Sequence, residues 1–357
     1  MSEKPFAPVS VSPEPTSRSA SVAAPAQGAG VQQRTKAEHR RAWIMSNVLT
    51  IAVGVVLLVL LIFFSSTADS FATIPNVLNM LRQIAPTMVV AVTMTFVITT
   101  AGIDLSVGSV VALSGSLLAI WVKGGMDPTV ALGLVLLMGI GVGAVNGYFA
   151  SYQGLPPFIV TLATLSIVRG TALLITQGYS TPIPGEAWIT SLGQGRVGGV
   201  PMPAIIALVV VVLGWFVFTQ TPFGRYVVGL GSNAESLRRT GVNTRLIGLL
   251  VFIASGLAAS IAGTLIATRL ASGSSNAGVG FELEAITAVV LGGTSLMGGR
   301  GSVVGTALGA LVLGVIANGL VLLHVSPFYV QIVQGAILLL AIFLNTRVFS
   351  RFGTARR

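Results

Sequence analysis

Few side chains in the long apolar stretches of this chain could take part in chemistry. Asp104 is the only acid placed well inside an apolar region, and a buried carboxylate suggests a functional role because burying a charge is costly. The same residue precedes the apolar run 105–113 and could instead cap the helix that this run predicts. We expect Arg169, inside another apolar stretch, either to snorkel outward or to pair with a carbonyl or carboxylate, in a structural role. Without paired carboxylates or histidine clusters in these stretches, no catalytic or metal site is expected.

A polar segment near the middle of the chain has the signals of a short capped helix. Asn233 is a good N-cap, and Glu235 falls in the first turn, where the helix dipole favours an acid. Arg238 and Arg239 fall in the last turn, and Gly241 can adopt the left-handed conformation that ends a helix. The pattern therefore predicts a helix of roughly two turns between two apolar stretches. An ordinary solvated loop helix would show the same pattern.

The elements that must position these residues are membrane helices. Of the 357 residues, 53% are hydrophobic and 8% are charged, against about 25% charged in soluble domains. A bilayer accepts the apolar exterior that such a composition requires. The charge-free gaps predict an all-α, polytopic membrane protein with about ten transmembrane or re-entrant helices. The expected spans are 42–68, 83–103, 105–122, two within 128–168 separated near 151–157, 203–220, 246–267, the short gap 285–299, and two within 301–346 separated near 324–328.

Composition and charge also predict the domain organisation. Residues 1–42 are rich in Pro, Ser and Ala and are expected to form a disordered cytoplasmic tail. Residues 43–346 form the expected transmembrane domain, with a cytoplasmic loop at 221–245, and residues 347–357 form a basic cytoplasmic tail. With both termini inside, most of the 20 lysines and arginines lie on the cytoplasmic side, so the net charge of +10 reflects topology and no nucleic-acid partner is expected. The outer side would hold Arg82, Lys123, Arg196 and Arg269.

Glycines recur at helical spacing in two places. We expect each set to line one helix face and to let a second backbone approach closely. The two sets are Gly139, Gly143 and Gly147, and Gly301, Gly305 and Gly309. The stretches Val97–Gly115 and Val289–Ala310 each place a glycine-rich break between apolar runs, both on the predicted cytoplasmic side. Paired breaks of this kind often mark a transport pathway.

Four ordered motifs are similar to those of a known family. They are GIDLSVGSVVAL (Gly102–Leu113), GLPPFIVTLATLSIVRG (Gly154–Gly170), TPFGRYVVGLGSNAESLRRTGVN (Thr221–Asn243) and ITAVVLGGTSLMGGRGSVVGTALGA (Ile286–Ala310). From about residue 47 to residue 346 the chain resembles the ribose/xylose-type permeases of bacterial ABC importers, the inner-membrane components of binding-protein-dependent sugar transport. The resemblance implies a transporter subunit, not an enzyme, that forms the translocation pathway for a pentose or ribose-like monosaccharide.

The resemblance also implies partners in the bacterial cell membrane. Such permeases pair as homodimers or with a second permease, and they work with a cytoplasmic ATP-binding subunit and a secreted sugar-binding protein. ATP and Mg would be bound by that ATPase, with no cofactor in this chain. Consistent with this, none of Lys4, Lys36 and Lys123 follows a glycine, as a P-loop requires. Residues 233–241 resemble the coupling helix that docks on the ATPase, which implies roles for Asn233, Glu235, Arg238, Arg239 and Gly241.

A neutral sugar dense in hydroxyl groups needs small polar side chains along its path. The candidates are Thr99, Asp104, Ser106, Asn146, Thr161, Thr287, Thr294, Ser295 and Asn318. Hydroxyl groups can also bond to their own helix backbone, and amides can bridge helices, so a structural role is open for each residue.

Other hypotheses stay open at this point. A permease of the same superfamily could carry another small solute, such as a branched-chain amino acid or an autoinducer-like furanosyl compound. A secondary transporter driven by an ion gradient would be expected to bury coupling carboxylates, for which Asp104 is the candidate. A purely structural membrane protein is a third class, and the capped polar helix argues against it.

Overall fold

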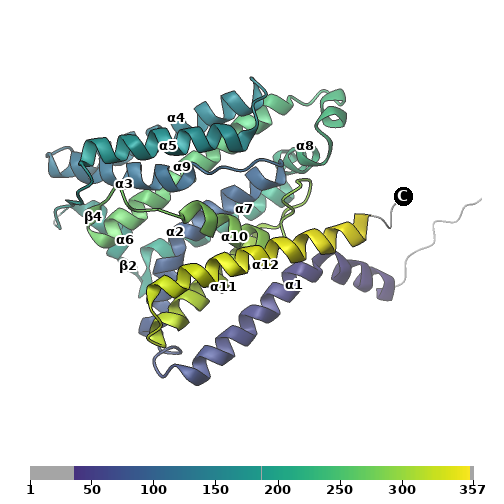
Figure 1. Cartoon of the computed structure of the whole chain (residues 1–357), viewed down its shortest axis with the longest axis horizontal. Coiled ribbons are helices and arrows are strands. Elements are labelled where there is room, and N and C mark those ends of the chain that lie inside the picture. Colours follow the sequence, from purple (N-terminus) through teal and green to yellow (C-terminus); the bar gives the residue numbers. More distant parts are fainter. Residues whose placement is uncertain (1–35, 186, 354–357) are drawn as a thin grey trace, which may run out of the picture. The chain divides into compact units, whose positions relative to one another are not determined.

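The structure is a computed structural model that describes residues 36–185 and 187–353, so most of the expected N-terminal tail lies outside the described residues. Residues 47–357 form one compact unit, and the fold described below is that of its described part. Figure 1 shows this part as a bundle in which α4 and α5 run side by side, as do α11 and α12. The helices are α1 (Lys36–Thr67), α2 (Ile74–Thr99), α3 (Val107–Lys123), α4 (Pro128–Ser151), α5 (Pro157–Thr176), α6 (Ser191–Gln194), α7 (Met202–Gln220), α8 (Pro222–Arg239), α9 (Thr244–Leu270), α10 (Phe281–Leu291), α11 (Val303–Leu322) and α12 (Pro327–Gly353).

The described residues form four β-strands of two residues each. β1 (Thr181–Pro182) pairs with β4 (Ser272–Gly273), and β2 (Arg196–Val197) pairs with β3 (Val200–Pro201), both antiparallel. A 3-10 turn, η1 (Trp188–Thr190), lies in the same long loop between α5 and α7. These short pairings tie the loop together and to the end of α9.

The expectation of an all-α, polytopic membrane protein is confirmed. In the described part, 7 helices are long and apolar enough to cross a membrane: residues 49–67 of α1, and the whole of α2, α4, α5, α7, α9 and α11. The other expected spans are shorter. α3 and residues 328–343 of α12 form shorter apolar helices, and α10 has 11 residues. The gap at 285–299 thus holds a half-length helix followed by a break.

Several expected boundaries differ from the observed ones. α2 begins at Ile74 instead of near residue 83, because the single charge of Arg82 does not interrupt an otherwise apolar helix that has proline in its first turn. Arg82 therefore lies within a helix, and so does Arg269, in the last turn of α9, whereas both were expected in outer loops. α1 begins at Lys36, inside the expected tail, and α12 continues to Gly353, beyond the expected domain end at residue 346.

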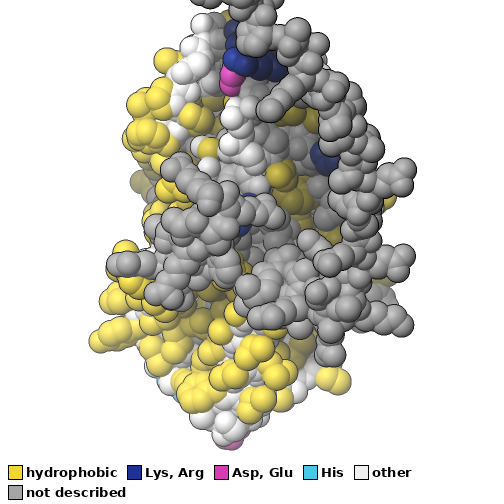
Figure 2. All heavy atoms as spheres, turned by 90° about the vertical axis from the view of Figure 1, so that its right-hand side faces the viewer, with side chains coloured by type: hydrophobic (Ala, Val, Ile, Leu, Met, Phe, Trp, Pro, Cys, Tyr) yellow, Lys and Arg dark blue, Asp and Glu magenta, His cyan; other side chains and the backbone are white. Residues whose placement is uncertain are grey.

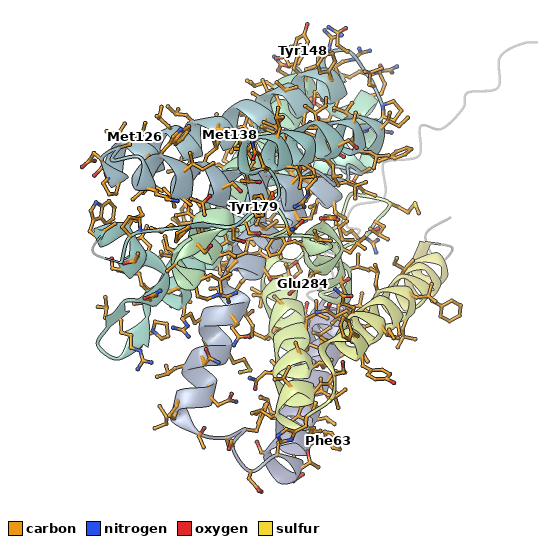
Figure 3. All side chains as sticks on the ribbon, turned by 60° about the vertical axis from the view of Figure 1, so that its left-hand side comes forward. Phe63, Met126, Met138, Tyr148, Tyr179 and Glu284 are labelled. Atoms are coloured by element: carbon orange, nitrogen blue, oxygen red, sulfur yellow. The ribbon has the colours of Figure 1, made fainter. Side chains whose placement is uncertain are left out.

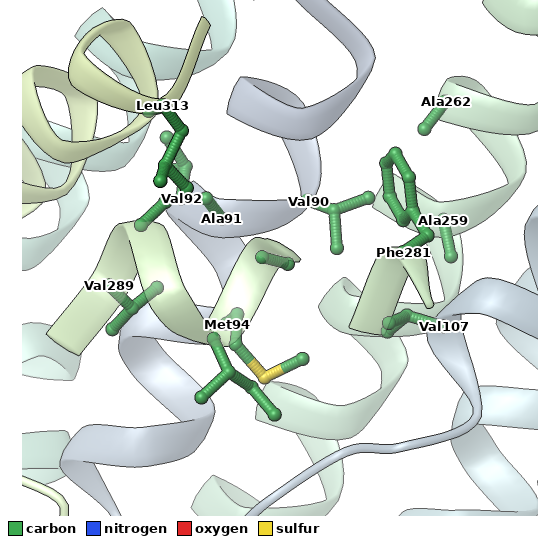
Figure 4. Packing of buried hydrophobic residues seen from close by; sticks show 14 of the residues in the cluster. Val90, Ala91, Val92, Met94, Val107, Ala259, Ala262, Phe281, Val289 and Leu313 are labelled. Carbon is green, nitrogen blue, oxygen red and sulfur yellow. The ribbon is translucent and has the colours of Figure 1, made fainter. Parts of the chain in front are cut away.

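The buried core lies around α9. This helix packs against α2, α3 and α4 and buries small residues along most of its length. Figure 4 shows the adjoining apolar contacts, in which Met94 of α2, Phe281 of α10 and Leu313 of α11 fill the space between helices. Large hydrophobic side chains on α1, α5 and α7 are exposed instead, among them Leu174 at 78%. On the face seen in Figure 2, most coloured side chains are hydrophobic, as a surface in contact with lipid requires.

The two glycine sets behave largely as expected. A Cβ atom added to Gly143 of α4 would collide with the carbonyl oxygen of Phe252 on α9, and Gly139 is equally close to Gly256. In α11, Gly305 and Gly309 face the end of α10 with the same lack of space. Gly301 was expected on the same helix face, but it precedes α11 and instead approaches Thr99. The prediction that Gly301 shares this helix face was therefore wrong, because the helix begins only at the Ser302 cap.

Replacing Gly143 by alanine should destabilise the protein. The added methyl group would force α4 and α9 apart, at a cost of about 1–3 kcal/mol. Gly141 lies two residues away on the same helix with open space around it, so Gly141→Ala is the matched control and should leave stability unchanged or slightly raised. Thermal unfolding of both variants in detergent measures the difference. Equal melting temperatures would contradict this account of α4–α9 packing.

Candidate functional site

Polar candidates from distant parts of the sequence meet in a buried cluster where α3 begins. One carboxylate oxygen of Asp104 accepts hydrogen bonds from the backbone N–H of Ser106 at 3.0 Å and from its hydroxyl group at 2.7 Å. The other oxygen accepts a hydrogen bond from the hydroxyl group of Ser255, on α9, at 2.8 Å. All three side chains are buried. Asp104 therefore binds the backbone N–H of Ser106, which occupies the N-cap position of α3, so it does not itself cap the helix; it links the start of α3 to α9.

Asn146 extends this cluster to two more helices. Its side-chain amide, on α4, donates a hydrogen bond to the Ser106 hydroxyl oxygen at 2.9 Å. Its carbonyl oxygen accepts one from the hydroxyl group of Thr164, on α5, at 2.6 Å. Thr161, one turn earlier on α5, donates to the backbone carbonyl of Ile103 at 3.0 Å. One connected network thus joins α3, α4, α5 and α9, and such a network fixes the relative positions of the helices that it joins.

The remaining pathway candidates lie outside this cluster. The hydroxyl groups of Thr99 and Thr287 each donate to the carbonyl four residues earlier in their own helix, at 2.6 Å. Thr294 accepts a hydrogen bond from the backbone N–H of Ser302 across the break between α10 and α11. The backbone N–H of Ser295 bonds to the carbonyl oxygen of Arg300 in the same break.

Asn318 pairs with Asn76 through two reciprocal amide hydrogen bonds of 2.9 and 3.0 Å. The pair joins α11 to α2, at a place that none of the cluster residues reaches. The structure therefore brings together Asp104, Ser106, Asn146 and Thr161, and it leaves the other candidates at separate helix contacts. Hydrogen bonds to a residue's own helix backbone, or between neighbouring helices, are also the contacts expected of residues with a purely structural role.

Arg169 has the carbonyl partners that the sequence suggested. Its guanidinium group, on α5, donates hydrogen bonds to the carbonyl oxygens of Ser275 at 2.7 Å, Ala277 at 2.8 Å and Gly278 at 3.2 Å. The carboxylate of Glu282 also lies within its electrostatic reach. Arg169 therefore anchors the loop that leads from β4 into α10, which confirms a structural contact for this residue.

Sequence reasoning missed a second charged group inside the bundle. Glu284 on α10 accepts a hydrogen bond from the hydroxyl group of Thr87 on α2 at 3.0 Å, and Arg269 lies within reach of its charge. Figure 3 places Glu284 among the helices in the interior of the molecule. Among the described residues, Nε of Arg82 and Nη1 of Arg269 are buried without a hydrogen-bond partner. These charges stood at the edges of charge-free gaps, so the sequence suggested loops where helices continue.

The polar helix near the middle of the chain has the local geometry that the sequence predicts. Asn233 leaves the helical region (φ −161°, ψ 95°) and kinks α8, so residues 234–239 form a separate turn. Its side-chain oxygen accepts a hydrogen bond from the backbone N–H of Ser236 at 2.9 Å, as an N-cap does. Gly241 follows with a left-handed φ of +87°. The predicted cap and helix end are both confirmed.

The charged side chains of this short helix are exposed and paired with one another. Glu235 binds Arg238 at 2.7 Å and Arg239 at 3.0 Å, with side-chain exposures of 51%, 65% and 78%. Such exposed pairs contribute little to stability, at most about 1 kcal/mol. The pairs place two arginines beside one acid on an exposed polar surface.

Replacing Asn146 by alanine should destabilise the helix bundle. The Thr164 hydroxyl group would lose its acceptor, at a cost of about 1–3 kcal/mol, and the Ser106 hydroxyl group would keep only its hydrogen bond to Asp104. Ser166→Ala on α5 is the control, because this exposed hydroxyl bonds only to its own helix backbone. Thermal unfolding in detergent should show a lower melting temperature for Asn146→Ala alone. If both variants melt like the parent chain, the network does not hold these helices.

Comparisons with known proteins agree on one family. The family model described as the permease component of a branched-chain amino acid transport system matches residues 76–342. The ribose import permease protein RbsC of Haemophilus influenzae is 39% identical over 81% of this chain and 90% of its own length. The corresponding protein of Bacillus subtilis is 40% identical, over 82% of this chain and 91% of its own length.

A third relative carries a different sugar in its name. The xylose transport system permease protein XylH of Escherichia coli is 35% identical, over 81% of this chain and 90% of its own length. No solved structure matches the chain. The family match covers most of the chain, and the ribose import permeases are similar over nearly their whole length. The chain therefore belongs to the family of ribose/xylose-type permease subunits of bacterial ABC importers.

Proposed function

We propose that this permease subunit forms the translocation pathway for a ribose-like monosaccharide in the bacterial cell membrane. The names of its relatives support the substrate class, because they include ribose, D-allose and xylose transporters. A branched-chain amino acid is the second candidate, favoured by the description of the matching family model. The sugar has more support, since the relatives that are similar over most of their length are named for sugars.

The observation that supports ATP-driven transport best is the exposed polar helix of residues 234–239. It is the part of α8 after the kink at Asn233, and it lies between the apolar spans Met202–Gln220 and Thr244–Leu270. Glu235 fixes Arg238 and Arg239 on its exposed side, where acidic groups of a partner could replace the internal pairing. We propose that this helix docks on a cytoplasmic ATPase and that both chain termini lie on the cytoplasmic side.

The rest of the proposed complex follows from the same family. Two copies of the chain, or this chain and a second permease, would enclose the pathway, and a secreted sugar-binding protein would deliver the substrate from outside. No cofactor is proposed for this chain. ATP and Mg would belong to the ATPase, in keeping with the missing P-loop lysine.

The buried cluster takes a supporting role in this proposal. Asp104, Ser106 and Asn146 are at most 1% exposed, so none of them meets a passing sugar in the conformation described. They hold the residues between α2 and α3 against α4, α5 and α9. We propose that they keep one wall of the pathway in shape, while direct contact with the sugar remains a prediction for all nine polar candidates.

Reconstitution tests the proposed function. The chain is placed in liposomes alone, and together with an ATPase and a sugar-binding protein of the same importer class from the same organism, and uptake of radiolabelled ribose is measured with and without ATP. The proposal predicts uptake that needs all components and ATP. Competition by unlabelled ribose, xylose or allose, but not by leucine, would support a sugar. Uptake by the chain alone under an ion gradient would overturn the proposal.

Reversing the charge at Glu235 should uncouple transport from ATP. Glu235→Arg places a third cation beside Arg238 and Arg239 and opposes the dipole at the helix start. Each 1.4 kcal/mol lost from docking weakens association about tenfold, so co-purification of the ATPase and uptake should both fall about tenfold or more. Glu235→Gln is the milder control. Gly241→Pro should act similarly, because proline cannot adopt the observed φ of +87°.

Membrane insertion should be unchanged in these variants, since the substituted residues lie outside the apolar spans. Normal uptake by Glu235→Arg with a normal amount of bound ATPase would show that the helix is not a docking element.

A further inference from the structure

α8 touches both glycine-rich breaks through backbone atoms just before its kink at Asn233. A Cβ atom added to Gly231 would collide with the carbonyl oxygen of Thr99, at the end of α2, and would lie 2.6 Å from the backbone nitrogen of Gly299. Gly299 belongs to the break between α10 and α11, and Thr99 opens the break between α2 and α3. One residue of α8 therefore contacts two segments that are about 200 positions apart in the sequence.

The two breaks also contact each other at this point. The backbone N–H of Gly299 donates a hydrogen bond to the carbonyl oxygen of Thr99 at 2.9 Å. A Cβ atom on Gly298 would lie 2.9 Å from the Cβ atom of Ala101 and 3.0 Å from the carbonyl oxygen of Gly231. We call Gly231, Thr99, Gly298 and Gly299 the glycine junction. Three of its members have no side chain, so the three segments meet backbone to backbone.

The backbone conformations of the junction leave little freedom. Gly298 and Gly299 have left-handed φ values of +79° and +73°, which favour glycine. Ala101, in the opposite break, has a φ of +62° although it carries a side chain. The loop of the second break is closed by a hydrogen bond from the Ser295 N–H to the Arg300 carbonyl oxygen at 3.0 Å. Both breaks thus have a defined shape where they meet α8.

The junction directly precedes the short polar helix. Ser232 follows Gly231 and donates its hydroxyl group to the carbonyl oxygen of Val228 at 2.8 Å, so the α8 helix is intact up to this point. Asn233 comes next and both kinks the chain and caps residues 234–239. A displacement of the short helix would therefore reach the junction through a single intervening residue and its cap.

The first break leads directly to the buried polar cluster. Five residues after Thr99 stands Asp104, which binds the start of α3 and Ser255 of α9. The second break leads from Gly292 at the end of α10 to Gly305 in α11, which are also in close backbone contact. A shift of the first break would therefore displace the start of α3, and a shift of the second would displace α10 and α11.

Backbone contacts pass on movement better than side-chain contacts do. A side chain can change its rotamer and absorb a displacement, whereas a close-packed backbone cannot. We propose that the glycine junction transmits movement of the ATPase-docked helix 234–239 to both breaks at once. This inference rests on the proposed function, because it requires that the short helix docks on an ATPase.

Gly231→Ala tests the junction in the complete importer reconstituted with its ATPase and binding protein. The added methyl group would separate α8 from both breaks, so ribose uptake per ATP hydrolysed should fall at least tenfold, while ATPase binding and hydrolysis stay within about twofold. Gly141→Ala on α4 is the control, because nothing lies within 4 Å of its added Cβ atom, so the ratio should not change.

A second variant covers the case in which Gly231→Ala does not assemble. Ala101→Gly removes the methyl group beside Gly298 and suits the left-handed backbone at this position, so folding should be retained. The looser break should lower uptake per ATP about threefold.

An unchanged ratio of ribose uptake to ATP hydrolysis in Ala101→Gly would contradict the proposed role of the glycine junction. Uptake and hydrolysis that fall together in Gly231→Ala would contradict it too. If the parent importer itself shows no ATP-dependent uptake, the proposed function fails as well. If the parent importer is active and both variants keep the parent's uptake per ATP, only the proposed role of the glycine junction is contradicted.

Discussion

The close approach of helix backbones at glycines is the constraint on which the rest of the structure depends. Lipid tails are as apolar as leucine side chains, so membrane helices gain little from hydrophobic burial and associate through packing and hydrogen bonds. Gly143 lets α4 approach α9, and one turn away on these helices Asn146 and Ser255 reach the same buried cluster. Hydrogen bonds of 2.8–2.9 Å between such short side chains require that the backbones are already close.

The same constraint separates rigid parts from parts that can move. α4 and α9 are joined by glycine packing and by the polar cluster, and they form a fixed frame. The two helix breaks lack regular backbone bonds over several residues and meet α8 at the glycine junction. In the proposed importer, the ATPase would move the exposed helix, the junction would pass the movement on, and the frame would stay in place. Glu284 on α10 accepts a hydrogen bond from Thr87 on α2 and lies within electrostatic reach of Arg269 on α9.

Local features were predictable from the sequence, and tertiary ones were not. The cap at Asn233 and the left-handed Gly241 depend on a few neighbouring residues, and both are present. The glycine spacing likewise indicated the face of α4 that packs on α9. Asp104 and Asn146 both bond to the hydroxyl group of Ser106, a contact that depends on how the helices pack. The sequence therefore named both residues as candidates but did not predict that they lie together. Glu284 was missed because a charge beside an apolar gap looks the same in a loop and in a helix that buries it.

The central claim is that the exposed helix and the two breaks move as one body, and a distance measurement tests it most directly. This chain has no native cysteine, so cysteines introduced at the exposed Ser236 and Met297 can be labelled selectively in the isolated permease before the importer is assembled. In importers with one doubly labelled permease copy, the Ser236–Met297 distance should stay constant between nucleotide-free and ATP-bound states. The distance from Ser236 to a label at the exposed Val56 of α1 should change over the same step. A Ser236–Met297 distance that changes as much as the Ser236–Val56 distance would contradict the account.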